Sequence, residues 1–232
     1  MTSSFIDSSG EKPAIAYRPF APNDFEAVAR LFQDQWCSEI SDKAGRLASQ
    51  IDLCGYLEQT NWSLVAEKRL VSEDAPQLLG VTLLSLQGQP CPGAEVWTAQ
   101  REALLAEAKA AGPDLLAEVR SDVDMLEEEA QLACEYAASG QVGAAAELKL
   151  LIVSPAAQGL GVGGRLFSAA RATAADAAGG MFLITDDSCD VAFYDHKGLT
   201  RMVARPTQVD QLACPQDSAG FNLYVYAEGA TR

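Results

Sequence analysis

Histidine is almost absent from this sequence, and that scarcity limits the chemistry available to the protein. The 232 residues include one histidine, His196, and six cysteines, at positions 37, 54, 91, 134, 189 and 214. No two cysteines form a Cys-x-x-Cys pair, so neither a multi-histidine nor a thiolate-only zinc site of the usual spacing is expected. We therefore predict no bound metal. If the protein is an enzyme, its general base is expected to be a carboxylate.

The sequence also lacks a basic excess and any long apolar run. Acidic residues outnumber basic ones 32 to 17, a net charge of −15, so no nucleic-acid partner is expected, because phosphate contacts need a basic face. This charge would attract a cationic ligand weakly, and it also favours solubility. No stretch approaches the ~20 apolar residues that span a bilayer, and the N-terminus does not resemble a secretory signal. We expect a cytoplasmic protein with no membrane partner and with mostly buried, free thiols.

The spacing of apolar residues predicts one domain with a helical insertion. Residues 1–13 are polar and are expected to be flexible, and residues 14–232 are expected to form the domain. The predicted order is β-α-α-β-β-[αα]-β-α-β-α-β-β. The inserted pair of amphipathic helices, at 95–111 and 114–138, lies in a segment rich in Ala, Leu and Glu at about 90–140. Gly80 indicates a bulge in the second strand of a hairpin whose turn runs from Arg69 to Pro76.

A glycine-rich loop follows the predicted strand at 145–153. The segment VSPAAQGLGVGGRLF, which runs from Val153 to Phe167, places four glycines within six residues just before a predicted helix. Backbone N–H groups at a helix N-terminus carry partial positive charge, and glycines let a phosphate approach them. The run fits both G-x-G-x-x-G, which is typical of dinucleotide binding, and Gln-x-x-Gly-x-Gly, which is typical of coenzyme A binding.

The dinucleotide interpretation would make the protein an NAD(P)-binding oxidoreductase. Asp186 and Asp187 follow the loop at a suitable distance. However, five residues separate the strand from the first glycine, and only 45 residues follow Asp187, too few to complete a six-stranded sheet. A turn without a ligand is a third interpretation, although each glycine weakens the start of a helix by roughly 1 kcal/mol relative to Ala. We favour the acyl-CoA interpretation.

Four segments resemble, in order and spacing, the GNAT superfamily of acyl-CoA-dependent N-acyltransferases. They are YRPFAPNDFEAVARLF, the strand and loop that end in QGLGVG, the element FYDHKGL, which has Leu199 in place of the usual Phe, and the two closing strands. The resemblance covers about 14–88 and 143–229, so 90–140 is additional. It implies an α/β (α+β) GNAT fold. Its mixed, mostly antiparallel sheet of six to seven strands would be splayed between 145–153 and 181–185, with helices on both faces.

The resemblance also implies an activity and a coenzyme site. The protein would move an acetyl group from acetyl-CoA, its only expected cofactor, to a primary amine by direct attack through a tetrahedral intermediate. An acyl-CoA-binding or interaction domain without turnover is the alternative. The implied coenzyme contacts are the strand residues Leu151, Ile152 and Val153, the loop and helix residues Gln158, Gly159, Leu160, Gly161, Val162, Gly163 and Gly164, and Asp187, which stands where many members have Asn.

Two residues are implied to be catalytic. Tyr194 occupies the position of the family's thiolate-protonating Tyr, and a phenol with a pKa of about 10 can supply that proton; packing under the sheet is the alternative. Glu147 occupies a strand position that in some members carries the base, and burial would raise the pKa of a carboxylate there. The alternative for Glu147 is an ion pair with Lys149 on the same strand face.

Other features leave their roles open. Asp186, Asp187 and Asp190 either cap the helix at 190–197 or bind a cationic acceptor, for which Asp186 and Asp190 are the candidates. The insertion either forms part of the acceptor pocket, as a wall or lid, or provides a homodimer surface. The acceptor itself, whether a small amine, an aminoglycoside, a peptide N-terminus or a protein lysine, is not specified by the sequence.

Overall fold

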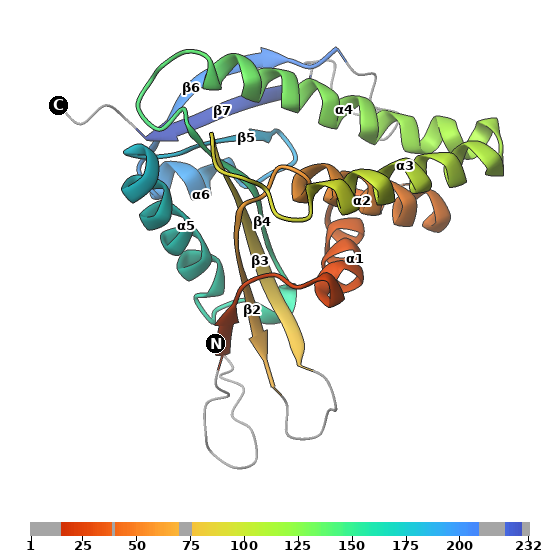
Figure 1. Cartoon of the computed structure of the whole chain (residues 1–232), viewed down its shortest axis with the longest axis horizontal. Helices are drawn as coiled ribbons and strands as arrows, with labels where there is room; N and C mark the ends of the chain where they lie inside the picture. The colour runs from red at the N-terminus through yellow and green to blue at the C-terminus, as the bar shows by residue number, and fades with distance from the viewer. Residues whose placement is uncertain (1–14, 39, 70–75, 209–220, 229–232) are drawn as a thin grey trace.

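The computed structural model describes residues 15–38, 40–69, 76–208 and 221–228. The segment 1–13, most of the Arg69–Pro76 turn and Cys214 lie outside the described residues. In the described part, seven strands form one sheet in the order β1-β2-β3-β4-β5-β7-β6 (Figure 1). The strands are β1 (Ile15–Arg18), β2 (Trp62–Lys68), β3 (Gln77–Leu86), β4 (Ala146–Val153), β5 (Phe182–Asp186), β6 (Leu199–Pro206) and β7 (Asn222–Glu228).

The sheet is mixed, and the two strands of its one parallel pair separate from each other. All neighbouring strands are antiparallel except β4 and β5. Those two strands pair only at Glu147 with Phe182, so from Leu148 to Val153 the β4 edge has no partner in β5, both strands being fully described. The predicted splayed, mostly antiparallel sheet is confirmed. The antiparallel pairs on both sides of this parallel pair also exclude the mostly parallel sheet of a dinucleotide-binding fold.

Helices cover both faces of the sheet (Figure 1). Apolar side chains of α1 (Phe25–Trp36) and α2 (Asp42–Leu57) pack against β2, β3 and β4 on one face. On the other face, α5 (Val162–Ala178) packs against the same strands and against β5 and β7. The alternation of strand side chains produces this layering, since Leu83 faces the α1–α2 side and Leu84 the α5 side. A short helix, α6 (Val191–His196), connects β5 to β6.

The insertion is a helical hairpin of α3 (Ala94–Ala111) and α4 (Pro113–Ala137), and it is part of the core. The N-terminal half of α4 packs Val119 and Val123 against α2 and α3. Its C-terminal half packs Leu132 and Tyr136 against β5 and β7. Figure 1 shows α4 reaching from the α2–α3 pair to the β5–β7 end of the sheet. The apolar stripe of α4 is therefore buried within the chain and is not available for a second protomer.

Several local predictions can be compared with the structure. The β2–β3 register shifts beside Gly80, where a Cβ would lie 2.8 Å from the Ile152 carbonyl oxygen, so the predicted bulge is confirmed. The expectation of mostly buried thiols was wrong for the described cysteines, because only Cys37 and Cys54 are buried and Cys134 is exposed. In the described residues, no helix is both long and apolar enough to cross a membrane.

A core substitution tests whether the insertion belongs to the folding unit. Leu132 is 1% exposed, and Leu132→Ala should lower the free energy of unfolding by about 2–5 kcal/mol through lost burial and a cavity. Urea unfolding followed by circular dichroism measures this change. Val96, 57% exposed on α3, provides the control, since Val96→Ala should change stability by less than about 0.5 kcal/mol. Equal, small effects of both variants would show that α4 docks without contributing to the core.

Candidate active site

A cavity of about 670 Å³ occupies the gap between β4 and β5. Its floor comes from the facing strands, with Leu148 to Leu151 on β4 and Leu183 to Asp186 on β5. Its walls come from the α1–α2 connection, α2, α4 and α6, and they include Asp52, Tyr56, Leu126, Glu129, Cys189 and Tyr194. Because β4 has an unpaired edge here, its backbone N–H and C=O groups are available to an extended ligand.

The glycine loop forms the end of this gap at the C-terminus of β4. Pro155–Ala157 form a 3-10 turn, and Gly161, with φ +72°, is the N-cap of α5. The first helical hydrogen bond runs from the Arg165 N–H to the Gly161 carbonyl (3.1 Å). The amides of Val162, Gly163 and Gly164 therefore precede the helical ladder and are available for an anion.

Not every amide of the predicted cradle is available. The N–H of Gln158 donates to Pro155 O and that of Leu160 to Ala157 O, each at 3.1 Å. Both bonds shape the loop, and they restrict the candidate anion donors to Gly159 and Gly161 in the loop and to the first turn of α5. Gly159 also has a positive φ, +76°, which favours glycine.

Two cations lie close to this loop. The Arg165 guanidinium carbon is 4.4 Å from the centre of the Tyr17 ring, a cation–π contact that holds the side chain against β1. The Lys197 ammonium lies 3.5 Å from the place a Cβ on Gly164 would occupy. Sequence reasoning missed Lys197, although its position directly after the FYDH segment, at the C-terminal end of α6, was a usable signal. The two residues make this end of the gap positive.

Tyr194 lies on α6 and lines the main cavity. Its ring packs 5.4 Å from Phe193 and 5.7 Å from Tyr226, measured between ring centres, so the packing expected as its alternative role is present as well. Burial raises the pKa of the Tyr194 hydroxyl above its usual value, and the carboxylates of Asp186 and Asp190 raise it further. The phenol therefore stays protonated at neutral pH, which is the form that an acid needs.

Glu147 forms an ion pair at the closed end of the gap. The Lys149 ammonium donates to Glu147 Oε1 at 2.9 Å, and the Lys149 side chain is 3% exposed. The pairing with Lys149, expected as the alternative to a catalytic role, is therefore present. Glu147 lines a second cavity of about 320 Å³ and not the main cavity that Tyr194 lines.

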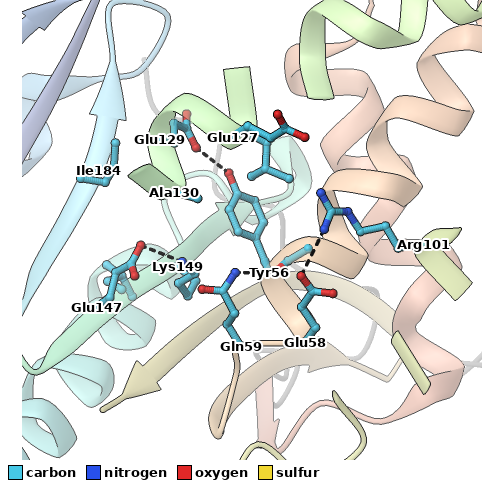
Figure 2. A pocket seen from close by; sticks show the side chains of 13 residues that line it. Tyr56, Glu58, Gln59, Arg101, Glu127, Glu129, Ala130, Glu147, Lys149 and Ile184 are labelled. Carbon is cyan, nitrogen blue, oxygen red and sulfur yellow. Dashed lines mark hydrogen bonds and ion pairs between the residues drawn. The ribbon is translucent and has the colours of Figure 1, made fainter. Parts of the chain in front are cut away.

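The inserted helix α4 places a further carboxylate at this site. Figure 2 shows Glu129 above Tyr56, whose hydroxyl donates to Glu129 Oε2 at 3.0 Å. Glu129 lines both cavities. Burial raises the pKa of Glu129 to about 7, and Asp186 raises it as well. The sequence carries a signal for this residue, since Glu129 is three residues after Leu126 and four before Ala133, and so lies on the apolar stripe of α4.

The three aspartates at the end of β5 and just beyond it have separate roles. Asp186 lines the main cavity and accepts hydrogen bonds from the Ser188 N–H and hydroxyl (2.7 and 2.6 Å). Asp187 accepts from the Tyr224 hydroxyl and from Asn222, so its carboxylate faces β7. Asp190 is the N-cap of α6, but its side chain makes no capping hydrogen bond. In the described residues, no group of three or more His, Cys, Asp or Glu side chains could hold a metal ion.

Solved acetyltransferases share this fold. NAA60 of Arabidopsis thaliana, in complex with a bisubstrate analogue, is similar with a TM-score of 0.53 and 11% identity, over 92% of this chain and 97% of that chain. A candidate phosphinothricin N-acetyltransferase gives 0.51 and 10%, over 94% and 100%. The protein smu.2055 from Streptococcus mutans UA159 gives 0.51 and 14%, over 91% and 97%. No protein-family model matches the sequence, and no curated protein is significantly similar in sequence.

The structure thus has the α/β fold of the GNAT acetyltransferases. At identities of 10–14% this likeness defines the fold and leaves the activity to be argued from the site.

A charge placed in the glycine loop tests the coenzyme site. Gly161→Glu should abolish acetyl-CoA binding in calorimetric titration, because a carboxylate would occupy the phosphate path and repel the anion. Gly140→Glu is the matched control, since Gly140 has a similar φ, +68°, and a Cβ at either glycine would meet no atom within 4 Å. Wild-type affinity in Gly161→Glu would place the coenzyme elsewhere.

Proposed function

We propose that the protein is an N-acetyltransferase that moves the acetyl group of acetyl-CoA to a primary amine. The observation that carries this proposal is the unpaired β4 edge, which leads from the main cavity to the amides at the start of α5. In an extended ligand, a pantetheine arm would pair with Leu151, Ile152 and Val153, and its pyrophosphate would meet the glycine loop. NAA60, a protein of the same fold, has been crystallised in complex with acetyl-CoA.

The cavity supplies groups for each proton transfer. The amine nitrogen attacks the thioester carbon after giving a proton to a carboxylate, and the tetrahedral intermediate collapses with cleavage of the C–S bond. Tyr194 then donates its hydroxyl proton to the departing thiolate, and the second proton that the nitrogen loses as it becomes an amide restores the Tyr194 hydroxyl. We assign the base to a carboxylate because His196, the one histidine, is exposed, and its Nδ1 lies 2.6 Å from the Ala192 carbonyl oxygen on its own helix.

The open cavity favours an enzyme over a silent acyl-CoA-binding domain. A domain without turnover would be expected to fill the gap beside Tyr194 with side chains, whereas the gap holds about 670 Å³ of open volume. Four acidic residues and one basic residue line it, namely Asp52, Glu118, Glu129 and Asp186 against Lys149. We propose that the acceptor is cationic at neutral pH, as a primary amine is.

An acceptor screen tests the activity. Release of free coenzyme A thiol would be followed with acetyl-CoA and, in turn, tyramine, spermidine, kanamycin, a short peptide with a free N-terminus and an N-blocked peptide containing one lysine. Turnover above the acceptor-free rate, with an acetylated product found by mass spectrometry, would support the proposal. Binding of acetyl-CoA without turnover of any of these amines would instead favour the silent domain.

Removal of one hydroxyl tests the acid. Tyr194→Phe should lower kcat by roughly 10²-fold or more with little change in acetyl-CoA affinity, because the thiolate would leave without its proton donor. Steady-state kinetics and calorimetry measure the two effects. Tyr136→Phe, which removes a hydroxyl from a tyrosine buried between α4 and β5, should leave kcat unchanged. Wild-type turnover in Tyr194→Phe would exclude Tyr194 from the chemistry.

A further inference from the structure

Glu129 lies where the two cavities meet. Asp52, Glu118 and Asp186 line only the main cavity, while Glu58, Glu127 and Glu147 line only the smaller one. Among the described residues, Glu129 is the one acidic side chain that lines both. It comes from α4, which is outside the two segments that resemble the GNAT superfamily.

The surroundings of Glu129 suit a group that exchanges protons near neutral pH. Burial raises the pKa of its carboxyl to about 7, and the hydrogen bond from Tyr56 holds it lower than burial alone would. Charged and titratable groups face it from every neighbouring element. They are Asp52 and Tyr56 on α2, Arg101 on α3 with its ion-pair partner Glu58, the Glu147–Lys149 pair on β4, Asp186 at the end of β5 and Cys189 in the loop that follows.

Glu147 is less well placed for the same task. Its carboxylate is neutralised by Lys149 at 2.9 Å, and it does not line the cavity that holds Tyr194. Protonating Glu147 would also leave the ammonium of Lys149, whose side chain is 3% exposed, without its counter-charge, which is costly for a buried group. Glu129 has no ion-pair partner of this kind among the contacts of the described residues, and its one hydrogen bond comes from a neutral phenol.

We propose that Glu129, supplied by the inserted helix, is the general base of the acetyl transfer and that Tyr56 is its positioning residue. This inference rests on the proposed function. On the main-cavity side, an N–H bond of the bound ammonium breaks and an O–H bond forms on Glu129, which frees the nitrogen lone pair to attack the thioester. The proton then leaves through the smaller cavity, whose wall includes the exposed Gln59 and Glu127.

The pH dependence of kcat/KM tests the base, with the best acceptor of the screened amines. In the wild type, kcat/KM should rise with pH with a midpoint near about 7, as Glu129 loses its proton. Glu129→Gln should lower kcat/KM by about 10²–10⁴-fold at neutral pH and remove that rising limb. This decrease in kcat/KM should become smaller as the pH rises toward the pKa of the acceptor amine, since an amine that is already unprotonated needs no base.

Three further variants sharpen the result. Glu102→Gln, at an exposed position on α3 that lines neither cavity, should keep the wild-type rate and profile. Tyr56→Phe should keep the limb but move its midpoint upward by roughly one pH unit, because the carboxylate loses a hydrogen bond that favours its charged form. Glu147→Gln should retain the limb with a lower midpoint, because the Glu147 carboxylate raises the pKa of Glu129. A wild-type profile in Glu129→Gln, or a limb that disappears only in Glu147→Gln, would overturn the proposal.

A second readout needs no acceptor. The folded-state pKa of Glu129 is raised above its unfolded value, so its contribution to stability is fully present below about pH 4.5 and is lost as the pH rises through about 7. The Glu129→Gln variant cannot lose stability in this way. The melting temperature of the variant minus that of the wild type should therefore increase between pH 5 and pH 8. A difference that does not vary with pH would overturn the proposal. If this difference appears but no amine is acetylated by the wild type, the proposed function fails and the base role fails with it.

Discussion

The structure depends on the separation of two neighbouring parallel strands. β4 and β5 pair at one position, Glu147 with Phe182, and then separate. The exposed edge of β4 carries backbone polar groups that a folded protein must satisfy with water or a ligand. Glycines are needed at the far end of that edge because Gly159 and Gly161 both adopt positive φ. The same parting divides the sheet into two halves, and some other element has to hold those halves together.

Helix α4 is that element. It packs Val119 and Val123 on α2, which covers the first half of the sheet, and Leu132 and Tyr136 on β5 and β7 in the second half. Its middle turn therefore crosses the gap, and Leu126 and Glu129 face the cavities there. An additional helical hairpin thus has two physical consequences: it buries the face that the splayed strands leave open, and it adds a carboxylate to the site.

Much of this could be predicted from the sequence, and the remainder depends on contacts between distant segments. The splayed sheet, the bulge at Gly80 and the two inserted helices followed from local patterns and from the resemblance, and all are confirmed. The pairing of Glu147 with Lys149 was one of two alternatives because strand periodicity places both on one face. The position of Glu129 against Tyr56 joins residues 73 apart in the sequence, and Lys197 reaches α5 across a β-α connection. No local period encodes such contacts, although a charged residue on the apolar stripe of α4 pointed to one of them.

The charges along the gap have a direction that suits the proposed reaction. Arg165 and Lys197 lie near the glycine loop, where a pyrophosphate would bind, whereas four acidic residues line the main cavity, which neither cation lines. Lys149 adds little positive charge there because Glu147 neutralises it. A protonated amine is therefore attracted to the acidic part, while its acetylated product, a neutral amide, is not. In the proposed reaction, the same field that would concentrate the acceptor would also favour release of the product, so one arrangement of fixed charges would serve both steps.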